Sequence, residues 1–156
     1  MQKEIVERIN KKAESIASGF YSDIISELEE LEEVGFVTSP IEQVFLIEWK
    51  FWTFLDSTII RVWQLDPQYQ DDSTAPYKID FRLTNLLDEK LKIGIELDSH
   101  IWHEKTPNQA TRDKERERFL QEHGWHLIRF TGREVWQDPA ECRSQMMKIA
   151  IALLQG

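Results

Sequence analysis

The stretch KIGIELDSHIWHEK, residues 92–105, begins as an apolar strand and ends in groups that bind metals or transfer protons. Isoleucine or leucine stands at every second position from 93 to 97, which is the period-two pattern of a β-strand. Glu96 and Asp98 are therefore expected on one strand face, roughly 6–7 Å apart at Cα. Neighbouring carboxylates repel each other, and a divalent cation beside them would remove that penalty. The pattern predicts a metal-assisted hydrolase with its site at the end of this strand.

The composition is that of one globular domain, with room for an appendage, because the chain has 156 residues and 41% are hydrophobic. No apolar run reaches the roughly 18–20 residues of a membrane span. The N-terminus lacks the apolar core of a signal peptide, so we expect a cytosolic (cytoplasmic) protein. The single cysteine, Cys142, excludes an internal disulfide and a Cys-rich zinc site.

The charge of −9 argues mildly against nucleic-acid binding, because phosphate attracts basic residues. The acidic surplus is uneven, however. Residues 1–60 carry five basic and twelve acidic side chains, whereas the segment from 99 to 133 carries seven basic and five acidic ones. The sequence therefore leaves room for a local polyanion site in its second half.

Two helices are expected before the first strand. Residues 2–33 contain no proline and repeat apolar side chains at helical spacing, with Gly19 a candidate break. This segment is either a partner-binding or dimerisation helix or a helix packed on its own domain. We assign residues 1–35 to an N-terminal helical extension and 36–156 to a second domain. Ser39, Pro40 and Glu42 have the spacing of an N-cap, an N1 proline and a capping-box acid, and the helix that follows is expected to be largely buried.

The rest of the chain alternates between strand and helix patterns. After the first helices, the expected order is three or four strands, a helix, a strand and a helix, which predicts an α/β sandwich around a central mixed sheet. The closing helix is expected to turn Met146, Met147, Ile149, Ala150, Leu153 and Leu154 inward. The expected elements are strands at 58–65 and 68–71 with a turn at Asp66-Pro67, a hairpin of strands 77–83 and 91–98, a helix at 107–123, a strand at 125–130, a turn at 131–135 and a helix at 139–154.

Four acids are expected to meet around the hairpin: Glu42, Asp80, Glu96 and Asp98. Mg²⁺ takes oxygen ligands and is commonly held by one or two carboxylates together with phosphate oxygens and water. The residues therefore predict a Mg²⁺ or Mn²⁺ site, where a bound metal polarises a phosphate and lowers the pKa of a bound water.

Several short segments, taken together, resemble the PD-(D/E)XK nuclease superfamily. The resemblance is closer to the branch of the very-short-patch-repair endonucleases and their small uncharacterised relatives. It covers roughly residues 39–135 and implies a restriction-endonuclease-like sandwich. The matching segments are YKIDF at 77–81, IELDSH at 95–100, WH at 102–103, Arg112-Asp113 with Arg116, GWHLIRF at 124–130, and EV at 134–135.

The resemblance also implies roles for individual residues. Asp80 and Glu96 hold the metal, with the Leu97 carbonyl as a third ligand. Glu42 matches a helical acid that orients the metal-bound water, and His103 assists the attacking water or the leaving group. The superfamily lysine falls at the position of Asp98, which is expected to help ligate the metal or orient water.

Phosphate contacts are expected from the helix at 107–123. Arg112 and Arg116 lie four residues apart on one face. Lys114 is a further candidate for phosphate contact, and it is also a candidate to replace the superfamily lysine that is absent at position 98. Trp102, in the expected site loop, could stack on a base or sugar. The leading hypothesis is a Mg²⁺-dependent endonuclease acting on DNA. The alternatives are an inactive nuclease-fold binding or assembly module, and a nuclease acting on RNA.

Overall fold

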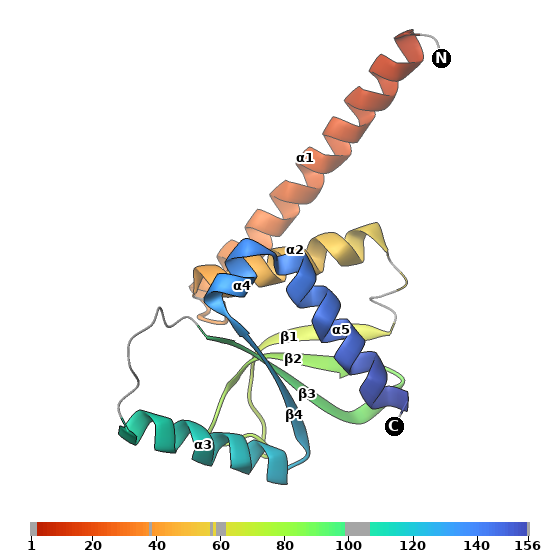
Figure 1. Ribbon diagram of the computed structural model, residues 1–156. Coiled ribbons are helices and arrows are strands. Elements are labelled where there is room, and N and C mark those ends of the chain that lie inside the picture. Colours follow the sequence, from red (N-terminus) through yellow and green to blue (C-terminus); the bar gives the residue numbers. More distant parts are fainter. Residues whose placement is uncertain (1–2, 38, 57, 59–61, 99–106, 156) are drawn as a thin grey trace. The chain divides into compact units, whose positions relative to one another are not determined.

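The computed structural model describes residues 3–37, 39–56, 58, 62–98 and 107–155 (Figure 1). The chain divides into two compact units, Met1–Phe36 and Val37–Gly156. None of the helices in the described ranges is long and apolar enough to cross a membrane.

The first unit is a single helix, α1, which runs from Lys3 to Glu33 without a break at Gly19. Its end is set by Gly35, whose positive φ of 74° suits a residue without a Cβ. The next residue, Phe36, donates its backbone N–H to the Leu31 carbonyl at 2.8 Å. This bond belongs to the glycine-terminated motif that closes many helices.

The second unit is built on a four-stranded sheet in the order β1-β2-β3-β4. The first three strands are antiparallel neighbours, and β4 runs parallel to β3. The predicted α/β sandwich with a mixed sheet is therefore confirmed, including the hairpin formed by β2 and β3. The strands are β1 at Trp63–Tyr69, β2 at Ile79–Asn85, β3 at Asp88–Asp98 and β4 at Trp125–Thr131.

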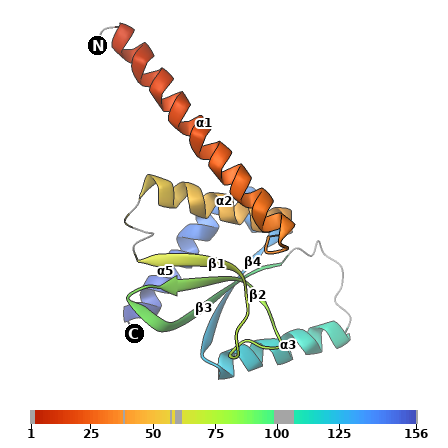
Figure 2. The same cartoon turned by 180° about the vertical axis from the view of Figure 1, so that it is seen from behind.

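Helices cover the sheet from two sides (Figures 1 and 2). The helix α3 is the crossover between the parallel strands β3 and β4 and contacts β4. The other three helices of the second unit contact one another on the opposite side of the sheet. Their bounds are α2 at Pro40–Leu55, α4 at Gly132–Gln137 and α5 at Pro139–Gln155, while α3 spans Pro107–Glu122.

Each side of the sheet has its own group of core side chains. On the α2 side, the ring of Phe45 lies 5.6 Å from that of Phe81 and 6.1 Å from that of Phe130. On the α3 side, Leu120 packs with Trp125 and other apolar side chains of the sheet. These two layers of apolar contacts fix α2 and α3 against the strands that carry the predicted site.

A glycine in β3 permits close packing on the α3 side. A Cβ built on Gly94 would lie 2.8 Å from the Leu127 side chain and 3.0 Å from that of Ile79. Because side chains alternate along a strand, Glu96 shares this face with Gly94. The same alternation therefore sends the Glu96 carboxylate toward α3.

The prediction of two strands separated by a turn at Asp66-Pro67 is wrong. A single strand, β1, crosses this dipeptide, and Pro67 pairs with Phe81. The strand lies at the sheet edge, where a proline without a backbone N–H is tolerated. The irregularity falls one residue later, at Gln68, which has a φ of 49°.

Two further predictions need correction. The expected turn at 131–135 is the helix α4, which begins with a capping box between Thr131 and Glu134. The helices α2 and α5 are also less buried than expected, because Leu55 is 67% exposed and Ile149 is 43% exposed. Each of these helices has a face toward solvent that includes residues predicted to be buried. Other α2 side chains with more than a third of their surface exposed are Ile47, Phe51 and Phe54, and Leu154 of α5 is 40% exposed.

Candidate metal centre

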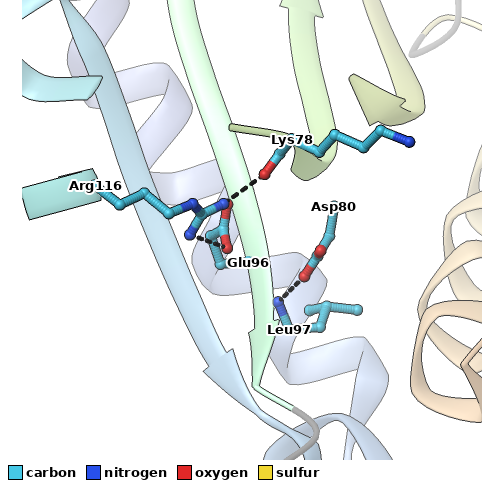
Figure 3. Close-up of polar contacts among 5 residues, drawn as sticks. All are labelled: Lys78, Asp80, Glu96, Leu97 and Arg116. Atoms are coloured by element: carbon cyan, nitrogen blue, oxygen red, sulfur yellow. Dashed lines mark hydrogen bonds and ion pairs between the residues drawn. The ribbon is translucent and has the colours of Figure 1, made fainter. Parts of the chain in front are cut away.

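The site begins where β2 and β3 stop pairing. The described register ends with Phe81 opposite Ile95, and beyond it the Leu97 N–H donates to the Asp80 carboxylate at 2.7 Å (Figure 3). The N–H and C=O of a strand residue point toward the same edge of the strand. The Leu97 carbonyl therefore faces the same gap as Asp80.

Glu96 lies beside this gap and is held by an arginine from α3. Its side chain is 9% exposed, and both carboxylate oxygens accept from Arg116, at 2.6 and 2.8 Å. The same guanidinium donates to the Lys78 carbonyl at 2.6 Å, just before β2 begins (Figure 3). A bidentate carboxylate–guanidinium pair is a strong and directional contact. Arg116 therefore joins α3 to both strands of the hairpin.

The electrostatic surroundings of Asp80 raise its pKa. Burial, the largest cause, together with the negative charges of Glu96 and Glu42, raises the pKa of Asp80 to about 6. The Leu97 N–H and the positive charge of Arg116 act in the opposite direction and only partly offset this. The single positive charge of Arg116 therefore does not neutralise all of the negative charge around the gap.

Arg116 itself stays charged. Burial alone would lower the pKa of its guanidinium, but the hydrogen bonds and charge of Glu96 outweigh burial and raise it. The pair is therefore ionic in character, and the guanidinium is a fixed positive charge at the edge of the site.

Glu42 combines a structural contact with a position near the site. It is 9% exposed, accepts the Ser39 backbone N–H at 3.4 Å and donates its own N–H to the Ser39 hydroxyl at 3.2 Å. The predicted capping box is thereby confirmed. Because the charge of Glu42 raises the pKa of Asp80, this acid also contributes to the field of the site.

The donors at the gap are two carboxylates and one backbone carbonyl. Among the residues that the structure describes, no three Asp, Glu, His or Cys side chains are arranged to hold a metal. Mg²⁺ does not need such a set, since it commonly binds through one or two carboxylates and keeps several waters. Each carboxylate oxygen has two lone pairs, so Glu96 retains acceptor capacity beside Arg116. Asp80, Glu96 and the Leu97 carbonyl therefore fit a hard divalent cation, and such a cation would relieve the penalty on ionised Asp80.

The other predicted site residues lie around this centre or outside the described ranges. Asp98 is the exposed last residue of β3. Arg112 and Lys114 are exposed on α3. Trp102 and His103 lie outside the described residues. Their roles stay predictions, as does the assignment of Arg116 to phosphate contact.

The ion pair between Glu96 and Arg116 is the main feature that the sequence interpretation missed. Spacing along α3 shows that Arg112 and Arg116 share a face, but not that Arg116 reaches the sheet. The available signal was the apolar strand around Glu96, because a buried acid almost always has a partner. The basic residues of the helix expected at 107–123 were the candidates for this partner.

The comparison with protein families identifies the fold family. The family model described as REase_MTES_1575 matches residues 48–149, about two thirds of the chain. The chain belongs to this restriction-endonuclease-like family. Asp80, Glu96 and Arg116 lie inside the matched segment, whereas Glu42 and α1 precede it. No curated protein and no solved structure matches the chain. The closer likeness to very-short-patch-repair endonucleases stays a prediction.

Proposed function

We propose that this protein is a metal-dependent endonuclease that hydrolyses phosphodiester bonds in DNA. Asp80, Glu96 and the Leu97 carbonyl would hold Mg²⁺ or Mn²⁺. The observation that carries the proposal is the placement of Asp80 and Glu96 at one gap, where burial and the negative charges of Glu96 and Glu42 raise the pKa of Asp80 to about 6. Strongly perturbed acids beside specific charge partners are concentrated at functional sites. Membership of a restriction-endonuclease-like family supports the same chemistry.

In this proposal each residue of the site has a defined task. A bound divalent ion supplies Lewis acidity to the phosphate and acidity to a coordinated water. Asp80 must be ionised to bind it, and Arg116 keeps the Glu96 carboxylate in place. Glu42 orients the attacking water from the start of α2, His103 assists the attacking water or the leaving group, and Asp98 helps to ligate the ion or orients water. The water attacks phosphorus in line with the leaving oxygen, and the phosphodiester bond to that oxygen breaks.

The DNA backbone would lie along α3. Arg112 and Lys114 are exposed on this helix, and their positive charges suit phosphate oxygens. Trp102 would stack on a base or sugar near the site. The chain offers little further surface for reading a sequence, so specificity would come from DNA structure or a partner protein.

Cleavage assays test this proposal directly. Plasmid and linear DNA are incubated with wild type, Glu96→Gln and the exposed-site control Asp72→Asn, in Mg²⁺ and in Mn²⁺. We expect wild type and Asp72→Asn to cut and Glu96→Gln to lose at least about 100-fold, since a metal ligand is removed. If wild type cuts no more than Glu96→Gln with either metal, the enzyme proposal fails for DNA. Matched RNA substrates test the RNA alternative in the same assay.

An inactive binding or assembly module is the second candidate. It is favoured by Asp98, which stands where the superfamily has lysine, and by the full neutralisation of Glu96 by Arg116. Calorimetric titration with Mg²⁺ separates the two candidates without a substrate. The enzyme should bind the ion, and Asp80→Asn should weaken binding at least about tenfold, whereas a module without the metal site should show no difference between these proteins.

A further inference from the structure

The N-terminal half of α1 carries an exposed apolar stripe. Ile5, Ile9 and Ile16 are 46%, 53% and 49% exposed, and their spacings of four and seven residues place them on one side of the helix. With 31 residues the helix is about 46 Å long at 1.5 Å per residue. Helices in water owe most of their stability to the packing of such a stripe. The stripe therefore indicates a surface that another helix covers.

The charges of α1 are separated along its length. Residues 3–14 carry all four basic residues and three acidic ones, a net charge of +1, whereas every charged residue after position 14 is acidic. Two copies aligned in parallel would place the acidic halves together, and like charges would oppose pairing. Two antiparallel copies place the basic half of each helix beside the acidic half of the other. The basic residues are Lys3, Arg8, Lys11 and Lys12, and the late acidic ones are Asp23, Glu27, Glu29, Glu30, Glu32 and Glu33.

The charged residues also lie on a suitable flank of the stripe. Arg8, Lys12, Asp23 and Glu30 are exposed and follow one another at spacings of 4, 11 and 7 residues, close to one, three and two helical turns. In an antiparallel pair related by a twofold axis, the same flank of each helix meets itself in reverse order. With the axis between positions 17.5 and 19, Lys12 of one copy faces Asp23 of the other, and Arg8 faces Glu30.

The same register pairs the apolar stripe. Around an axis at this position, Ile16 of one copy faces Phe20 of the other, and Ile5 faces Leu31. Gly19 lies at the crossing point on the charged flank, where an added Cβ would meet nothing within 4 Å. The apolar and charged patterns of α1 thus favour the same antiparallel orientation, with axes that fall within 1.5 residues of one another.

We propose that α1 joins two copies of this chain as an antiparallel helix pair. The occupant of its apolar stripe is the α1 helix of a second copy. This inference is independent of nuclease activity, since it uses only residues of the first unit.

A charge-swap experiment on the full chain tests the pairing by sedimentation equilibrium. The first variant is Arg8→Glu with Lys12→Glu, and the second is Asp23→Lys with Glu30→Lys. Each alone should dimerise at least about tenfold more weakly than wild type, because attraction becomes repulsion. An equal mixture should recover affinity within about threefold of wild type, because both contact regions regain opposite charges.

A matched control carries the same charge change on the other side of α1. Glu7→Lys with Glu14→Lys should dimerise like wild type, because these exposed residues lie away from the stripe. A wild type that is monomeric up to about 100 µM overturns the proposal. So does a mixture of the two variants that remains as weak as each alone.

Cross-linking determines the orientation. In a Cys142→Ser background, Gly19→Cys should form an intermolecular disulfide under mild oxidation, because the two copies of position 19 meet at the crossing point. Arg8→Cys should not, since its counterpart lies far along the antiparallel partner. Equal cross-linking at both positions indicates a parallel pair and overturns the proposed orientation.

Discussion

Replacing Asp80 with asparagine should stabilise the protein at pH 8 in the absence of divalent metal. In the folded chain the pKa of Asp80 is about 6, against an ordinary value of 3.8. A difference of about two pKa units corresponds to about 3 kcal/mol of destabilisation when the carboxylate is ionised. Asparagine has a similar shape, and its amide oxygen can still accept the Leu97 N–H, which Asp80 accepts at 2.7 Å. We therefore expect Asp80→Asn to raise the free energy of unfolding by about 2–3 kcal/mol.

The size of this effect depends on pH. Between the unfolded pKa near 4 and the folded pKa near 6, the folded protein binds more protons at Asp80 than the unfolded one. The contribution of Asp80 to stability therefore falls as the pH rises through this window, and the full penalty is present above it. At or below about pH 4 the carboxyl is protonated in the folded state, so the advantage of asparagine should largely disappear.

Urea denaturation followed by tryptophan fluorescence, with EDTA present, measures this difference at pH 4 and pH 8. Thermal unfolding should show a gain of about 5–10 °C at pH 8 for a chain of this size. Asp72→Asn is the matched control, because it removes one negative charge from an exposed position. The reasoning is refuted if Asp80→Asn is no more stable than Asp72→Asn at pH 8, or if its gain is the same at both pH values.

Three further substitutions test other parts of the fold. Gly94→Ala should lower the free energy of unfolding by about 1–3 kcal/mol in denaturant titrations, because the methyl group overlaps β4 and β2 side chains; Gly19→Ala, in open space, should cause no loss. Ser39→Ala should cost about 1 kcal/mol in the same assay by removing the α2 cap. Arg116→Gln should lower the free energy of unfolding by about 3 kcal/mol, because Glu96 stays buried without its cation. Mg²⁺ should raise the melting temperature of this variant more than that of wild type, because a competing positive charge is gone. An equal or smaller rise would contradict the shared position of Arg116 and the metal.

The fold was largely predictable because its signals are local. Ser39 and Glu42 form the capping box that their spacing predicts, and Gly124, with a φ of 79°, follows the end of α3. The strand alternation around Glu96 and the crossover helix α3 then restrict the sheet to a mixed arrangement. Each of these inferences needs only neighbouring residues and the fixed periods of helix and strand.

The errors arose where distant contacts override local preference. Asp66-Pro67 has the composition of a turn, but pairing with β2 keeps β1 extended at the sheet edge. The error at α4 is of a different kind, because the local capping signal of Thr131 and Glu134 was present in the sequence, but the short helix that it begins was read as a turn. The exposure of Leu55 likewise depends on which surfaces the rest of the chain covers, a fact that helical periodicity alone does not contain.

The site shows the same division between local and distant information, and its consequence is chemical. Asp80 and Glu96 are equivalent acids in the sequence pattern, yet Arg116 neutralises only Glu96 directly. Within the described ranges, Asp80 instead accepts one backbone N–H, that of Leu97, and its pKa is raised to about 6. Protons should therefore compete with a divalent cation for Asp80 as the pH falls through 6. Metal affinity should then decline about tenfold for each pH unit below that value, while Asp80→Asn binds weakly at every pH. A calorimetric titration series from pH 5 to 8 measures this slope, and a flat profile for wild type would exclude Asp80 as a metal ligand.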